Sequence, residues 1–285
     1  MIGSSSEGSR SDGAFTPMVP KLSSLRAVTY LTPGLPLELF ELSCDTIAEA
    51  LDRPVTLDVV EQGAENPFAN GEADLGFLCS PTFLRLRAQS PSSIELVPAG
   101  FVFDEERSGG AAVYFSDVVV RESHVAECFG DLEGCVWGYS DPLSLSGYFS
   151  ARQKLHALGD PDPFFAREVD TGSHLRSVQA ILQRDIDAAA IDSNVLARLF
   201  VEVPELEDQL RVVETLGPFP IQPLVVRSEL RDLAGPIANA LLACDQDGRR
   251  ARRLAALGVN GFRAVCVEDY DREQAEMAAL GWPAA

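Results

Sequence analysis

Residues 139–149, which read YSDPLSLSGYF, place two hydroxyls and a glycine where an apolar strand pattern gives way to a helical one. The N-terminus of a helix leaves amide N–H groups unpaired and has a partial positive charge. An anion can therefore bind among Ser144, Ser146 and the backbone of Gly147. Serine is also an ordinary N-cap residue, so the segment taken alone is equally compatible with a plain helix start. The pattern indicates a candidate site for a small anion.

Four other turns that follow strand patterns contain polar residues. They lie at residues 32–36, 80–82, 171–174 and 192–194. In open α/β sheets, ligands bind beyond the carboxyl ends of the strands. Each turn taken separately fits a helix cap, but together we expect them to line one crevice with the serine-rich turn.

His174 and Asp192 are the residues in these turns that can move a proton. His174 opens a helical run, where an imidazole can donate to an anion and can change charge near neutral pH; it is equally compatible with a packing histidine. Asp192 ends an apolar strand pattern, where a carboxylate needs hydrogen bonds or water. It can cap the next helix, hold His174 or contact a ligand hydroxyl. If the protein is an enzyme, we expect these two residues to be its catalytic proton-transfer groups.

Composition excludes several classes of function. The 285 residues include 43 Asp and Glu against 23 Lys and Arg, a net charge of -20 that repels nucleic acid and anionic membrane surfaces. No apolar stretch reaches the roughly 20 residues that cross a bilayer, so no direct membrane insertion is expected. Three dispersed histidines predict no metal site. Because P-loop, dinucleotide-binding and nucleophile-elbow motifs are all missing from the sequence, no cofactor is expected.

The start of the sequence bears on location. Its first ten residues, MIGSSSEGSR, lack the apolar core of a secretory signal. As written, the sequence therefore predicts a cytoplasmic protein. Removal of a natural signal would instead make it periplasmic or extracellular.

Alternating strand and helix patterns predict the fold class. A strand is expected at residues 25–31, a turn at 32–36, a helix at 37–51 with apolar residues at helical spacing, and further strands at 55–60 and 74–78. Strands that alternate with helices are typical of parallel βαβ units. The sequence therefore predicts an α/β protein.

Two lobes are predicted by an internal similarity. Residues 70–82 and 184–194 both read as a helix end, an Asp-led apolar strand and a polar turn. Extended runs at 114–121 and 212–226 can cross between the lobes as a hinge. We expect a flexible tail at 1–22, one lobe from 23–115 plus 220–285, and a second lobe from 116–219. In the first lobe, 230–257 is expected to be helical and 258–285 to form a loop and an amphipathic segment.

From about Leu25 to its end, the chain resembles the PhnD-like phosphate, phosphite and phosphonate substrate-binding proteins of ABC transporters. The resemblance rests on residues 141–147, on 172–174 before a helix, on 187–192 and on 216–223. It implies a two-lobed type II periplasmic-binding-protein fold. Each lobe would be a mixed, mostly parallel sheet flanked by helices, and a two-strand hinge would let the lobes close on the ligand.

The resemblance also implies an oxyanion pocket. By position, Ser144, Ser146 and His174 keep the groups that hold phosphonate oxygens, whereas Leu145 stands where the family usually has a hydroxyl residue. The family members that bind aminoalkylphosphonates look to have acidic residues near the positions of Asn194 and Gln222. The implied ligand is therefore an anion without an ammonium group, or something other than a phosphonate.

Three functions remain open at this point. The first is a solute-binding protein that holds a small anionic ligand between its lobes, with an ABC permease or a cytoplasmic protein as partner. The others are a cofactor-free biosynthetic enzyme on the same scaffold and a cytoplasmic sensor. The expected ligand-contacting residues are Tyr30, Ser80, Thr82, Tyr114, Ser144, Leu145, Ser146, Gly147, His174, Asp192, Asn194 and Gln222.

Overall fold

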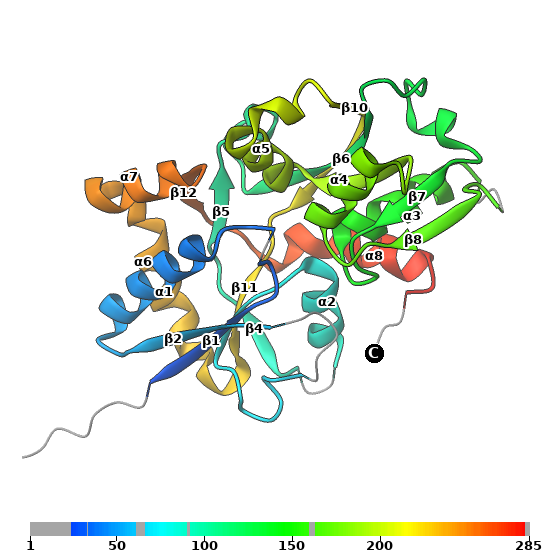
Figure 1. Cartoon of the computed structure of the whole chain (residues 1–285). Helices are drawn as coiled ribbons and strands as arrows, with labels where there is room; N and C mark the ends of the chain where they lie inside the picture. Colours follow the sequence, from blue (N-terminus) through cyan, green and yellow to red (C-terminus); the bar gives the residue numbers. More distant parts are fainter. Residues whose placement is uncertain (1–23, 33, 61–65, 90–91, 160–162, 283–285) are drawn as a thin grey trace, which may run out of the picture.

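The computed structural model describes residues 24–32, 34–60, 66–89, 92–159 and 163–282, and the tail expected at 1–22 lies outside these ranges. Two five-stranded sheets and one two-stranded sheet form the framework, with helices packed around them (Figure 1). The predicted α/β class is confirmed. No helix in the described ranges has both the length and the hydropathy that a bilayer crossing requires.

The first five-stranded sheet has the order β2-β1-β3-β11-β4. Strand β1 pairs in parallel with β2 and β3, whereas β11 runs antiparallel to both β3 and β4. The strands expected at 25–31, 55–60 and 74–78 are confirmed, each slightly shorter than predicted. In sheet order, the bounds are Val55–Val59, Leu25–Thr29, Leu75–Phe77, Leu224–Arg227 and Ile94–Leu96.

Helices α1 and α2 contact strands of this sheet, and helices α6 and α7 follow β11 in the chain. Helix α1 has the predicted bounds, Leu37–Leu51, because Pro36 precedes its first turn and Asp52 ends it in the left-handed conformation. Its buried face includes Leu39, Leu42 and Ile47, and it packs against α6. The helical stretch expected at 230–257 is confirmed as α6 and α7 with short turns. The other bounds are α2 Ser80–Ala88, α6 Ala234–Leu242 and α7 Gly248–Ala256.

The second five-stranded sheet has the order β10-β6-β9-β7-β8. Strands β7, β8 and β9 are parallel, and β6 runs antiparallel to both of its neighbours. The expected extended runs at 114–121 and 212–226 correspond to β6 and to β10 followed by β11. In sheet order, the bounds are Leu210–Pro220, Val113–Arg121, Ala188–Asp192, Val136–Tyr139 and Arg167–Asp170.

Successive side chains of β6 point to opposite faces of the second sheet and pack into different buried clusters. Val118 and Val120 belong to one buried cluster, which includes residues of α3 (Ser150–Ala157). Val119 belongs to another, with residues of α4 (His174–Gln183) and α5 (Ser193–Glu202). Helices therefore cover both faces of this sheet.

A salt-bridge network joins the segment after β5 (Gly100–Phe103) to the two long strands β6 and β10. The Arg107 guanidinium donates to the buried Asp117 of β6 at 2.7 Å and to Thr215 of β10 at 3.0 Å. Glu105 also accepts from Arg107. These bonds tie the crossing between the two sheets to β6 and β10.

The C-terminal part departs from the prediction of a loop after residue 258. Val259–Arg263 forms strand β12, which pairs antiparallel with β5 (Gly100–Phe103). The expected amphipathic segment contains helix α8, Asp271–Ala279. Short helical turns lie at Glu106–Ser108, Phe129–Leu132, Pro204–Leu206, Ser228–Leu233, Cys244–Gln246 and Val267–Tyr270.

Aromatic residues before and after α8 pack on α2 and on the helical turn that leads into α3. Before α8, Tyr270 packs on Phe83 of α2, and its hydroxyl donates to the carbonyl of Ile221 at 2.8 Å. After α8, Trp282 lies edge-on against Phe149, with ring centroids 4.7 Å apart. The C-terminal segment thus links the first sheet to the start of α3.

Candidate functional site

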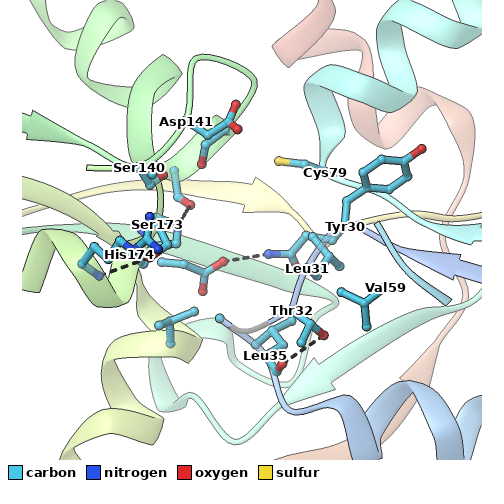
Figure 2. Close-up of a pocket in the computed structure, with 18 of the residues that line it drawn as sticks. Tyr30, Leu31, Thr32, Leu35, Val59, Cys79, Ser140, Asp141, Ser173 and His174 are labelled. Atoms are coloured by element: carbon cyan, nitrogen blue, oxygen red, sulfur yellow. Dashed lines mark hydrogen bonds between the residues drawn. The ribbon is translucent and has the colours of Figure 1, made fainter. Parts of the chain in front are cut away.

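A cavity of about 660 Å³ lies where the carboxyl ends of the strands of both large sheets meet (Figure 2). Most of its lining residues end or follow β1, β2 and β3 of the first sheet or β7, β8 and β9 of the second, whereas Tyr114 lies at the start of β6 and Gln222 between β10 and β11. This arrangement is typical of ligand sites in open α/β sheets. The lining comprises Tyr30, Leu31, Thr32, Gly34, Leu35, Val59, Val60, Cys79, Tyr114, Ser140, Asp141, Ser144, Ser146, Gly172, Ser173, His174, Arg176, Asp192, Val195 and Gln222.

Ser144 begins the serine-rich helix. Its hydroxyl accepts from the Gly147 amide at 2.9 Å, and the chain then forms a π-helical turn, Leu145–Phe149, that continues into α3. The N–H of Gly147 is therefore bonded to the cap instead of facing the cavity. The amide of Leu145 is also engaged, because it donates to the thiol sulfur of Cys79 at 3.4 Å. This contact joins the helix start to the first sheet.

Ser146 and His174 form the polar pair of the cavity. The hydroxyl oxygen of Ser146 lies 3.3 Å from Nε2 of His174. His174 begins α4, whose N-cap Ser173 accepts from the amide of Arg176. Burial lowers the pKa of His174 to about 4, so the imidazole is neutral at pH 7. A neutral imidazole beside a hydroxyl can donate hydrogen bonds to an oxyanion without a formal positive charge.

Asp192 lies on the floor of the cavity, at the end of β9. One carboxylate oxygen accepts from the amide of Asn194 at 2.8 Å and caps α5. The other accepts from the side-chain amide of Gln222 at 2.7 Å. Burial raises the pKa of Asp192 to about 7. Of the three roles open for Asp192, the structure shows helix capping.

Several buried polar atoms around this floor have no hydrogen-bond partner in the described structure. They are Oε1 of Gln222, Oγ of Ser80 and Nδ2 of Asn194. An unpaired buried polar atom costs free energy, which a ligand or water can recover by bonding to it. Of these residues, Gln222 lines the cavity. The floor therefore has spare hydrogen-bonding capacity for a polar guest.

The expected ligand contacts fall into two groups by position. Tyr30, Tyr114, Ser144, Ser146, His174, Asp192 and Gln222 line the cavity, whereas Ser80, Thr82, Leu145, Gly147 and Asn194 are outside its lining. Leu145 is fully buried in the core cluster of the first sheet, and Gly147 packs against Ser140.

Sequence reasoning did not select several residues of the lining, among them Cys79, Ser140 and Val59. Their position was the available signal, since Cys79 and Ser140 stand at or just after a strand end and Val59 is the last residue of β2. Within the described ranges, no three His, Cys, Asp or Glu side chains are grouped so as to hold a metal ion.

Comparison with known families decides what kind of protein this is. Residues 37–270 match a family described as the periplasmic substrate-binding protein of phosphonate ABC transporters. The chain belongs to this family. Membership implies a small anionic ligand and an ABC permease as partner. It also supports the binding-protein interpretation over the alternative of a cofactor-free biosynthetic enzyme. The periplasmic description of the family does not support the expected cytoplasmic location.

Solved structures show the same two-lobed type II periplasmic-binding-protein fold. PhnD1 from Prochlorococcus marinus, in complex with methylphosphonate, superposes with a TM-score of 0.77 at 16% identity, covering 92% of this chain and 99% of that one. A binding protein component of an ABC phosphonate transporter from Pseudomonas aeruginosa gives 0.73 at 17% identity, with coverages of 91% and 87%. XAC2383 from Xanthomonas citri, bound to ATP, gives 0.68 at 17%, with coverages of 91% and 98%. No curated protein matches the sequence significantly.

Proposed function

We propose that this substrate-binding protein captures a phosphate- or phosphonate-type oxyanion in the cavity and presents it to an ABC permease in the periplasm. The observation on which the proposal rests is the pairing of Ser146 with His174 at the serine-rich helix start, inside the cavity. In this proposal, residues 23–115 plus 220–285 form one lobe and residues 116–219 form the other.

Neutral dipoles would hold the anion, together with Arg176, a cation among the residues that line the cavity. The protein has a net charge of -20, which disfavours the long-range approach of an anion. Hydroxyl and imidazole donors in a cavity of low dielectric constant form stronger bonds than they do in water. The anion would bridge the lobes and favour the closed state through its higher affinity for that state.

The ligand would lack an ammonium group. Gln222 and Asn194 are neutral, and Gln222 already donates to Asp192. The Asp192 carboxylate accepts a bond on each oxygen, and burial raises its pKa, which disfavours the charged form that an ammonium group requires. These features support a solute whose only charge is its oxyanion.

Calorimetric titration and thermal unfolding test the proposal, with inorganic phosphate, methylphosphonate and acetate as probes. At 100 times its dissociation constant, a ligand should raise the free energy of unfolding by about 2.7 kcal/mol. Ser146→Ala and His174→Ala should each weaken binding of the best oxyanion at least tenfold. Ser228→Ala is the matched control, because its hydroxyl donates to the carbonyl of Ser92 and the residue is outside the cavity lining.

Two results would count against the proposal. In the first, neither phosphate nor methylphosphonate would bind to the natural protein. In the second, both would bind to the Ser146→Ala and His174→Ala variants as tightly as to the natural protein.

A further inference from the structure

The cavity is larger than a bare oxyanion requires. Its volume is about 660 Å³, whereas a water molecule occupies about 30 Å³ in the liquid. Pockets of about 300–1,000 Å³ usually bury whole organic ligands, most of whose contacts are apolar. The oxyanion donors at Ser146 and His174 therefore account for only part of the space.

An apolar surface occupies the side of the cavity formed by the first sheet. We call Leu31, Leu35, Val59 and Val60 the apolar wall; all four line the cavity and follow or end strands β1 and β2. Figure 2 shows Leu31, Leu35 and Val59 across the pocket from Ser140 and His174. Val59 is 49% exposed, so much of its apolar surface is free to be covered by a ligand.

The turn after β1 closely approaches the second sheet's helices at one edge of this wall. A Cβ atom placed on Gly34 would lie 3.2 Å from a methyl carbon of Val195 on α5. Val195 also lines the cavity and adds a further aliphatic side chain. One aliphatic side chain from helix α5 thus extends the apolar wall.

Charged groups are absent from the apolar wall itself. Among the described lining residues, the carboxylates are those of Asp141 and Asp192, which follow or end strands of the second sheet. Both already accept hydrogen bonds from backbone amides. Among the residues that the structure describes, a substituent that rests on the wall finds neither a counter-charge nor a row of donors, so hydrocarbon fits this described surface better than an ammonium group.

From this arrangement we infer that the transported solute is an organic phosphonate or phosphate monoester with an uncharged apolar substituent, which packs on the apolar wall. The inference rests on the proposed function, because it takes the oxyanion to bind beside Ser146 and His174. It adds the chemical class of the rest of the molecule. Each methylene that covers the wall should tighten binding about fourfold, which corresponds to about 0.8 kcal/mol.

Isothermal titration with matched probes tests the inference. The probes are methylphosphonate, n-propylphosphonate, 2-aminoethylphosphonate and monoethyl phosphate. The last three have nearly the same length and differ in a terminal methyl, a terminal ammonium and an ester oxygen. We expect n-propylphosphonate to bind at least tenfold more tightly than methylphosphonate and at least tenfold more tightly than 2-aminoethylphosphonate. Monoethyl phosphate distinguishes a phosphonate solute from a phosphate ester. If the natural solute is a phosphonate, n-propylphosphonate should bind more tightly than monoethyl phosphate. If it is a phosphate ester, monoethyl phosphate should bind more tightly.

A double variant, Val59→Thr with Val60→Thr, tests the wall directly. Threonine keeps the β-branched shape but adds hydroxyls, so the preference for propyl over methyl should fall to threefold or less. Val212→Thr is the control, because Val212 is a 40% exposed strand valine outside the cavity lining. Unchanged melting temperatures in the absence of ligand would establish that the variants fold.

The outcomes separate this inference from the proposed function. If methylphosphonate binds and Ser146→Ala abolishes binding, but the propyl compound gains nothing or the aminoethyl compound binds equally well, the proposed function stands and the inference is overturned. If no oxyanion probe binds, the proposed function fails and the inference fails with it.

Discussion

The side-chain amide of Gln222 donates a hydrogen bond to the carboxylate of Asp192 over 2.7 Å, and both residues are buried. Gln222 stands between β10 and β11, whereas Asp192 ends β9. The bond therefore joins the end of a strand in the second sheet to the segment that returns to the first. Asp192 also caps α5, so the same pair holds the floor of the cavity in place and fixes the start of that helix.

Removal of this donor should destabilise the protein. In Gln222→Met, which keeps most of the side-chain volume, one oxygen of a buried carboxyl group loses its partner. We expect the free energy of unfolding to fall by about 1–3 kcal/mol in urea titrations at pH 7.5. Gln209→Met is the control: its amide donates to a backbone carbonyl at the exposed surface, and the change should stay within about 0.5 kcal/mol. Equal losses in the two variants would show that the buried bond contributes nothing special.

Asp192 and His174 should have opposite effects on stability as pH changes. Burial raises the pKa of Asp192 from 3.8 in the unfolded chain to about 7, so between these values the folded state binds more protons. The Asp192 contribution to the free energy of unfolding therefore increases as pH falls from 7 to 3.8. Burial lowers the pKa of His174 from 6.5 to about 4, so its contribution decreases as pH falls from 6.5 to 4. In the natural protein the two trends oppose each other over most of this range.

Single substitutions should reveal each trend. Relative to the natural protein, His174→Gln is expected to become more stable on acidification from pH 6.5 to 4.5, and Asp192→Asn less stable over the same range. Urea titrations at half-unit pH steps measure both differences, and subtraction of the natural protein removes the effect of the other carboxylates. A His174→Gln difference that does not vary with pH would contradict the lowered pKa of this partly buried imidazole.

The fold was predictable because its signals are local. Helix α1 has both the apolar spacing of a helix and clear ends, with Pro36 before it and Asp52 in a left-handed conformation after it. Strand β12 lacks such signals. Its register with β5 shifts between Val259 and Gly261, and Gly261 has a φ of +132°, so the strand contains an irregularity that alternation of side chains does not reveal.

The cavity was only partly predictable because much of it has no chemical signature. Ser146 and His174 are polar residues at helix starts, which sequence patterns can identify. Val59 and Val60 look like any strand valines, and only the convergence of strand ends from both sheets makes them part of a cavity. The three-residue spacing of Ser144 and Gly147 suits a helix cap, so the glycine amide is bonded within the turn.

Gly147 should not tolerate a side chain. A Cβ atom there would lie 1.9 Å from the hydroxyl oxygen of Ser140 and 3.0 Å from the His174 ring, so one of these groups must move. We expect Gly147→Ala to lower the free energy of unfolding by about 1–3 kcal/mol and to weaken oxyanion binding. Urea and calorimetric titrations measure the two effects. Gly235→Ala is the control, since a Cβ atom there meets nothing within 4 Å, and it should bind like the natural protein. Normal binding by Gly147→Ala would contradict the packing of the serine-rich turn.

Trp282 should report ligand binding through its fluorescence. Its ring lies edge-on against Phe149, with 4.7 Å between centroids, and Phe149 is in the same helical turn as Ser146. If an oxyanion at Ser146 draws the lobes together, the surroundings of Trp282 change with it. We expect methylphosphonate to alter the tryptophan emission of the natural protein in a saturable way, with the same dissociation constant that calorimetry gives.

The sequence has two tryptophans, and this permits a matched comparison. Trp137 is buried in a core cluster of the second sheet, stacked on Phe165 at 4.8 Å, so its surroundings should change little when the lobes move as bodies. Trp282→Phe should therefore lose the ligand-dependent signal but keep its affinity within about threefold, whereas Trp137→Phe should keep the signal. If Trp282→Phe kept the whole ligand-dependent change in emission, the change would come from Trp137 in the core of the second sheet. The contact of Trp282 with Phe149 would then not respond to ligand binding.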